Sequence, residues 1–233
     1  MRAEAVSATR RATGDPRPAR RSAPTRLDPD VHAEITVAAG ARSADVLRRL
    51  SSASEALDRE RFDEAHRMVA PLARQFPDVA ALHELAGLAS YRSGRWNQAI
   101  GELETARSLN SSVALLPVLA DCYRALRRWV EVEAIWQQVR AASPAHEVAA
   151  EARIVVAGSL ADRGDLKAAI KLLSGAMRVP KKVREHHLRQ WYVLADLCDR
   201  AGDTVGAARW FRTIAEIDPM YVDVADRLRA LGR

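Results

Sequence analysis

The chain has 233 residues, of which 48% are hydrophobic and 28% charged, as expected for one or two ordinary domains or one elongated repeat domain. Eleven glycines and ten prolines are too few for a fibrous or wholly disordered chain, and two cysteines support neither a disulfide framework nor a thiolate metal site. The formal net charge is +6, and most of it lies in residues 1–26, which hold seven arginines and two acidic residues.

Residues 1–26 combine these arginines with small polar residues and three prolines, and they have almost no large apolar side chain. Such a segment cannot bury enough surface to offset the entropy of ordering, so we expect a disordered basic arm. The arm is either a solubilising tail or an electrostatic contact for nucleic acid or an acidic protein; its prolines argue against a transit peptide. Its candidate phosphate contacts are Arg10, Arg11, Arg17, Arg20 and Arg21.

A short capping element is expected in residues 27–43. Asp28 supplies an N-cap and Pro29 a first-turn proline, which predicts a helix from Pro29 to Ala39 that ends near Gly40. The first repeat of an array needs such an element because it would otherwise expose its inner face.

Residues 80–111 show the pattern that recurs through the rest of the chain. They predict two amphipathic helices with a turn at 92–95, and small residues lie at helical spacing on the faces that must meet. The residue that opens the second helix of each pair recurs at intervals of 34, 33, 37 and 38 residues, at Phe62, Trp96, Trp129, Leu166 and Thr204. Three residues later stand the small or short residues Ala65, Ala99, Val132, Ala169 and Ala207. The small position of the first helix holds Ala53, Gly87, Ala120, Ala157 and Ala195.

This set of positions, at a period close to 34 residues, resembles the tetratricopeptide repeat, and more loosely the uncharacterised repeat proteins of high-GC bacteria that carry a basic arm. The resemblance implies an all-α fold, a right-handed α-solenoid of about five helix pairs in residues 44–233. The repeats are expected at about 46–79, 80–112, 113–149, 150–187 and 188–219, and a solvating helix at 220–232.

In this family, partners usually bind a concave groove lined by the first helices. The resemblance therefore implies a partner-binding groove formed by Glu84, Tyr91, Arg92, Asp121, Arg124, Glu151, Asp162, Arg189, Tyr192, Asp196 and Arg200. The alternative is that these residues form ordinary solvated helix faces. Tyrosines flanked by arginines favour binding, since that pairing is common in hot spots.

The sequence shows little that could carry chemistry. It has no phosphate-binding glycine loop, no histidine or cysteine pair at metal spacing, and no serine with a partnered base. A positive run at 178–189 adds Lys181, Lys182 and Arg184 as phosphate contacts, although such a run is more often a solvated edge.

We therefore expect a non-catalytic cytoplasmic scaffold that needs no cofactor and binds a protein or peptide partner. No stretch reaches the roughly 18 apolar residues of a membrane span, and no secretory signal begins the chain. The alternative function is a nucleic-acid or ribosome-associated factor anchored by the basic arm.

Overall fold

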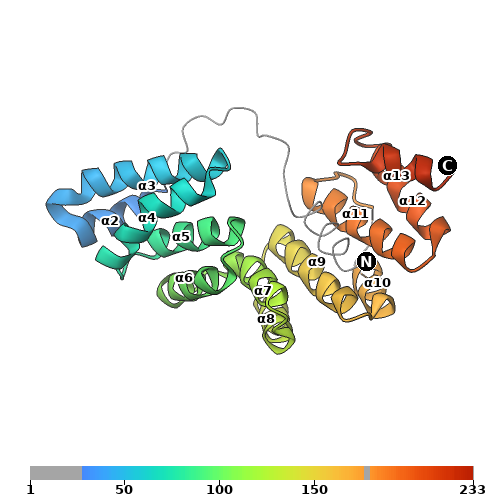
Figure 1. The fold of residues 1–233 in the computed structure, drawn as a ribbon, viewed down its shortest axis with the longest axis horizontal. Helices are drawn as coiled ribbons and strands as arrows, with labels where there is room; N and C mark the ends of the chain where they lie inside the picture. Colours follow the sequence, from blue (N-terminus) through green and yellow to red (C-terminus); the bar gives the residue numbers. More distant parts are fainter. Residues whose placement is uncertain (1–27, 176–178, 233) are drawn as a thin grey trace. The chain divides into compact units, whose positions relative to one another are not determined.

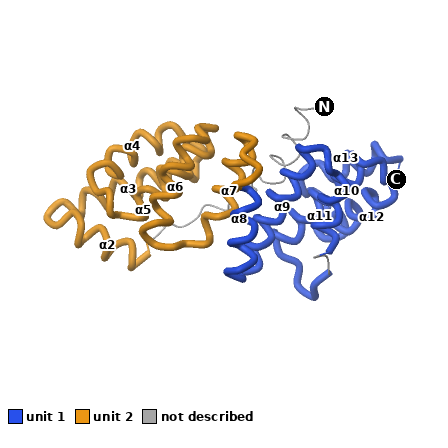
Figure 2. The backbone as a smooth tube through the Cα atoms, turned by 90° about the horizontal axis from the view of Figure 1, so that it is seen from below, with its two compact units in different colours: residues 1–18, 132–233 blue, residues 19–131 orange. Residues whose placement is uncertain are grey.

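The computed structural model describes residues 28–175 and 179–232, and every regular element in those ranges is a helix. The chain divides into two compact units, with the border inside α8 (Trp129–Ala142) (Figure 2). Unit 2 contains the described residues up to 131, and unit 1 contains those from 132 onward. The fold is all-α, and in each unit helix pairs stack in chain order as in an α-solenoid.

Unit 2 begins with α2 (Pro29–Ala39), which has the bounds predicted from the sequence. The Asp28 side chain accepts a hydrogen bond from the Asp30 backbone N–H at 2.9 Å and so caps the helix. A 3₁₀ turn, η1 (Gly40–Arg42), then leads into α3 (Ser43–Asp58). Ile35 of α2 is buried in the core of this unit, so α2 packs against the first helix pair.

The remaining helices of unit 2 follow as successive pairs (Figure 1). They are α4 (Phe62–Gln75), α5 (Ala80–Arg92), α6 (Trp96–Asn110), the 3₁₀ turn η2 (Val113–Leu115) and α7 (Leu116–Ala125). Each packs on its neighbour in sequence, and the first helix α5 also contacts the first helices α3 and α7. This second set of contacts brings the first helices onto one side of the unit.

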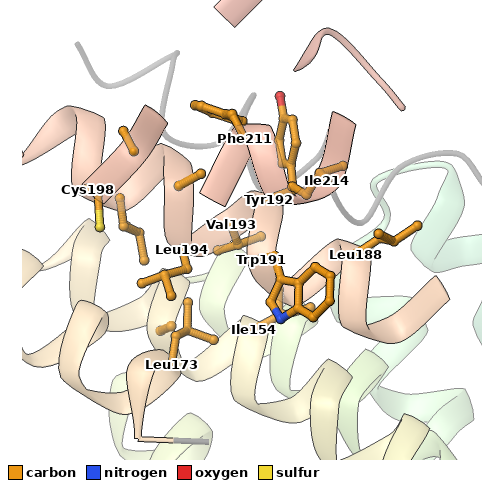
Figure 3. Close-up of a cluster of buried hydrophobic side chains, with 14 of the residues drawn as sticks. Ile154, Leu173, Leu188, Trp191, Tyr192, Val193, Leu194, Cys198, Phe211 and Ile214 are labelled. Atoms are coloured by element: carbon orange, nitrogen blue, oxygen red, sulfur yellow. The ribbon is translucent and has the colours of Figure 1, made fainter. Parts of the chain in front are cut away.

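Unit 1 has the same construction. It contains most of α8, followed by α9 (His146–Asp162), α10 (Leu166–Ser174), α11 (Glu185–Arg200), α12 (Thr204–Ala215) and α13 (Val224–Ala230). Its core joins Ile154 of α9, Leu173 of α10, Trp191 of α11 and Phe211 of α12, all at most 1% exposed (Figure 3). The first helices α9 and α11 are again in contact.

The turn inside each helix pair is closed by the same type of backbone hydrogen bond. The first residue after the turn donates its N–H to the carbonyl five residues earlier, at 2.8–2.9 Å, in all five pairs: Arg61 to Ala56, Arg95 to Ser90, Arg128 to Tyr123, Asp165 to Leu160 and Asp203 to Cys198. Such a bond closes a helix through a left-handed residue. Glycine fills that position at Gly94, Gly164 and Gly202, while Glu60 and Arg127 adopt it with φ of 59°.

Small residues allow close packing at the predicted positions. The second helices begin at the five residues expected, and the small positions that follow are buried at 0–2% exposure in every pair. The α5–α6 pair packs tightly at Gly87 of α5, where a Cβ atom would lie 2.7 Å from Cγ of Leu103 on α6. The size of the side chains at these recurring positions therefore determines how closely the two helices of a pair can pack.

Some expected borders differ from the helices. The starts expected at 46, 150 and 188 fall inside α3, α9 and α11, which begin at Ser43, His146 and Glu185. The start of α11 has no serine or threonine cap that the sequence could signal. Instead, the His187 ring nitrogen Nδ1 accepts a hydrogen bond from the Arg184 backbone N–H at 3.0 Å. The last helix is shorter than 220–232, since Val222 has a φ of 48° and α13 begins only at Val224. The basic arm at 1–26 lies outside the described residues.

Candidate partner-binding surface

All the residues expected to line a groove lie on first helices. Unit 2 carries Glu84, Tyr91 and Arg92 on α5 and Asp121 and Arg124 on α7, while unit 1 carries Glu151 and Asp162 on α9 and Arg189, Tyr192, Asp196 and Arg200 on α11. Their surroundings differ widely, from the complete burial of Tyr192 to the exposure of Asp162.

In unit 2 a polar network joins neighbouring first helices. The Tyr91 hydroxyl of α5 donates to Oδ2 of Asp121 on α7 at 2.8 Å, and Nη1 of Arg124 lies 3.3 Å from Oδ1 of the same carboxylate. Burial is the main reason why the pKa of Tyr91 is raised, so this hydroxyl stays protonated and donates. The network orients three of the expected residues through contacts within the unit.

Arg92 is the exposed member of the set on α5. Its guanidinium lies 4.6 Å from the centre of the Phe62 ring, and its Nη2 is 3.8 Å from Oε1 of Glu60. The Phe62 ring therefore supports the guanidinium from one side, and its exposed hydrogen-bond donors stay available to solvent.

Glu84, two turns before Arg92 on α5, is half-buried and has neither a hydrogen bond nor an ion pair with any described residue. Burial raises the pKa of its carboxyl, and no neighbouring cation offsets that effect. The adjacent His83 contrasts with it: its Nδ1 lies 2.7 Å from Oε2 of Glu102, and its Nε2 lies 3.0 Å from the carbonyl of Pro77. Glu84 thus presents acceptor oxygens that no described residue uses.

In unit 1, an arginine–glutamate ion pair joins α9 and α11. Nη2 of Arg189 lies 2.7 Å from Oε2 of Glu151, and both side chains are about a quarter exposed or less, at 20% and 25%. Asp162, at the end of α9, and Arg200, at the end of α11, are exposed. The exposed members of this set therefore lie at the helix ends.

Tyr192 and Asp196 are covered by the last helix and the turn before it. Tyr192 is 0% exposed and donates its hydroxyl hydrogen bond to Oδ1 of Asp223 at 2.6 Å. Asp196 is 5% exposed and accepts from Nη2 of Arg227 at 3.0 Å. Burial raises the pKa of Asp196, and Arg227 opposes that shift. Both residues fix the position of α13 and offer no exposed surface of their own.

Sequence reasoning did not identify the residues that make this cover. Asp223 and Arg227 are partners of α11, and Tyr221 donates its hydroxyl hydrogen bond to Oε1 of Glu185 at 3.0 Å. The sequence signal for these contacts lies at 221–227. A tyrosine, an aspartate and an arginine stand there at intervals that let each of them contact α11.

The expected phosphate contacts divide into two groups. Lys181 and Lys182 are exposed, and so is Arg184, whose Nη1 lies 2.9 Å from Oε1 of Glu147. The five arginines expected in the arm, Arg10, Arg11, Arg17, Arg20 and Arg21, lie outside the described residues. Within the described ranges no group of three or more metal-ligating side chains gathers, and no helix is long and apolar enough to cross a membrane.

Comparison with known protein families gives a match for part of the chain. Residues 50–114, which run from the middle of α3 to η2, match the family model of the tetratricopeptide repeat. No curated protein matched the chain. The match supports a tetratricopeptide-repeat protein, and it covers the two helix pairs around the Gly87 contact and the Glu84 carboxylate.

Proposed function

From the tetratricopeptide-repeat match and the chemistry of the first helices, we propose that the chain is a non-catalytic cytoplasmic scaffold. Its partner is a peptide or helix of another protein, which binds to the first helices within a unit. Tetratricopeptide repeats generally mediate interactions between proteins. This function requires no cofactor and no covalent step.

The proposal rests on the half-buried Glu84 carboxylate, which has no partner among the described residues. A half-buried carboxylate without a partner is costly, and a donor brought by a ligand removes that cost. A lysine, an arginine or a chain of backbone N–H groups from the partner would supply such a donor. The proposal therefore includes a positively charged or N–H-rich segment opposite α5.

The neighbouring residues support the same side of α5. Arg92 is exposed and is supported by Phe62, while Tyr91, Asp121 and Arg124 are held by their mutual hydrogen bonds. Side chains that are already ordered lose little conformational entropy when a partner binds. In unit 1 the exposed Asp162 and Arg200 and the paired Glu151 and Arg189 take the corresponding role, and Tyr192 and Asp196 act as supports.

The test is selection of ligands from a library of displayed random peptides on the full-length chain. We expect selected peptides to carry basic residues and to bind a Glu84→Gln variant about tenfold more weakly or worse, since a charge-assisted hydrogen bond contributes about 1.5–3 kcal/mol. Deletion of residues 1–26 is expected to leave the affinity unchanged, which separates this function from anchoring by the arm.

The matched control is Glu64→Gln on α4, a second helix of the same unit. Glu64 forms an exposed ion pair with Arg61, so its loss is expected to change the affinity by less than about twofold. Equal losses in the two variants, or a library that yields no ligand, would count against the proposal.

A further inference from the structure

The four lysines of the chain are confined to one segment. The chain has 36 basic residues, and all the lysines among them lie between residues 167 and 182. Residues 166–184 contain no aspartate or glutamate, although 30 acidic residues occur in the chain. This segment therefore holds all the lysines and no negative charge, and it is not part of the proposed protein-binding side.

The structure places these lysines on an exposed part of unit 1. Lys167 and Lys171 lie one turn apart on α10, a second helix, and Lys181 and Lys182 lie in the connection that leads to α11. All four are exposed, and none forms an ion pair with a described residue. On the first helices, by contrast, the charge of Arg124 and Arg189 is matched by a carboxylate at 2.7–3.3 Å.

Helix α12 extends the positive charge. It carries Arg209 and Arg212, both exposed and without an ion pair to a described residue, and it has no acidic residue. Because α11 and α12 form an antiparallel pair, the end of α12 lies beside the start of α11, where the lysine-bearing connection arrives (Figure 1). Contacts between aromatic rings agree with this placement of α12 beside α11. The rings of His187 and Trp210 both lie within 6.2 Å of the Trp191 ring, measured between ring centres.

We propose that Lys167, Lys171, Lys181, Lys182, Arg209 and Arg212 form a surface that binds the phosphate backbone of a nucleic acid. We call it the lysine surface. Ammonium groups are compact, hydrated point charges that contact phosphates without a fixed geometry, and each contact releases a counterion. Glu216 and Asp218 follow α12 and mark the edge of this surface.

A nucleic acid fits this surface better than a lipid membrane does. Membrane-surface segments add a continuous apolar face to their positive charge. Among the described residues of 166–184 and of α12, the exposed large hydrophobic side chains are Val179, in the connection before α11, and Val205, at the start of α12. Trp210, half-buried beneath the Arg209 guanidinium at 5.5 Å, is an aromatic ring within reach of an unpaired base.

The experiment measures binding of the full chain to a labelled oligonucleotide of about 16 nucleotides over a range of salt concentrations. In a variant with all four lysines changed to glutamine, we expect at least tenfold weaker binding at low salt. The slope of log affinity against log salt is expected to fall by about 0.7 for each lysine that contacts a phosphate. Changing the four lysines to arginine should preserve binding, because the charge is kept. The basic arm is present throughout, so differences between variants report on the lysines.

The matched control compares two second helices. Lys167→Gln with Lys171→Gln on α10 is set against Arg67→Gln with Arg74→Gln on α4, two exposed cations that also lack an ion pair with a described residue. A loss confined to the α10 variant, with unchanged thermal unfolding, supports the proposal. Equal losses in both variants, or binding only to anionic vesicles or to polyglutamate, would overturn it.

Discussion

Gly87 shows at the scale of one residue how a helix pair closes. A Cβ atom there would lie 2.7 Å and 2.8 Å from side-chain atoms of Leu103 and 3.2 Å from its backbone nitrogen. We therefore expect Gly87→Ala to lower the free energy of unfolding by about 1–3 kcal/mol, because overpacking outweighs the better helix propensity of alanine. Urea unfolding at fixed pH measures the change.

Gly101 is the natural control for that measurement. It lies in the interior of α6 and is exposed, and a Cβ atom added to it would meet no atom within 4 Å. Gly101→Ala should raise the free energy of unfolding by about 0.5–1 kcal/mol, the difference between the two residues in a helix. The packing interpretation fails if both substitutions change stability in the same direction.

The two cysteines link burial to pH. Burial raises the pKa of Cys122 to about 12 and that of Cys198 to about 11. In the unfolded chain a thiol ionises at about 8.5. Because the folded pKa is the higher one, the stability from the neutral thiols is complete below the unfolded pKa and is lost as pH rises through the folded values.

We therefore expect the free energy of unfolding to fall more steeply above pH about 9 in the natural chain than in a Cys122→Ala, Cys198→Ala variant. Chemical unfolding measured across the alkaline range gives the two slopes. The variant also loses buried volume, which lowers its stability at every pH, so the comparison is between slopes. Identical slopes would show that the thiols are not shielded from solvent.

At the scale of an element, Arg227 contributes two hydrogen bonds to the contacts that hold α13 in place. Arg227 donates from Nη2 to Oδ1 of Asp196 at 3.0 Å and to Oδ2 of Asp199 at 2.9 Å. Arg227→Met would remove the hydrogen-bonded cation of the buried Asp196 carboxylate, whose second cation, Arg200, lies 3.8 Å away, and we expect a loss of about 3–5 kcal/mol of stability. Adding Asp196→Asn should recover part of that loss. Thermal and chemical unfolding of the three proteins provide the measurement.

Arg229 lies on the same helix and supplies the control. Its ion pair with Asp226 is exposed on both sides, at 77% and 68%, so Arg229→Met should change the stability by less than about 0.5 kcal/mol. A similar loss for Arg227→Met and Arg229→Met would mean that α13 is not fastened through Asp196.

The helices themselves could be predicted from the sequence, because each depends on local signals. Phe62 and Trp96 open second helices where apolar spacing and the turn residues place them. The borders of α9 and α11 were less predictable: α11 begins with a histidine that accepts a backbone N–H, and no propensity rule singles out that arrangement. Tertiary contacts overrode the sequence pattern in the same way at α13, where Tyr221 is buried and the helix starts late.

The candidate site was predictable only as far as the helix that carries each residue. Sequence periodicity placed Tyr192 and Asp196 on a first helix, and the structure agrees. It could not show that Asp223 and Arg227 cover them, because such a contact depends on how the chain turns after α12. Nor could it show that Glu84 lacks a partner among the described residues, since this depends on every side chain packed around it.

At the scale of the whole molecule, stacked helix pairs carry both proposed binding surfaces, one for a protein and one for a nucleic acid. The repeated turn bond and the small residues bring first helices beside first helices within each unit. The first helices carry the carboxylates and paired arginines of the proposed protein-binding side, whereas the four lysines lie on a second helix and the connection after it. A protein ligand and a nucleic acid would therefore contact different elements.

The most direct test of the account is amide hydrogen exchange of the full chain with and without a selected peptide. Binding to the first helices predicts slower exchange in α5 and α7, around Glu84, Arg92 and Asp121, because a bound ligand suppresses local opening of the backbone it covers. The second helices α4 and α6 should exchange as before. Protection confined to α4 and α6 would contradict the account.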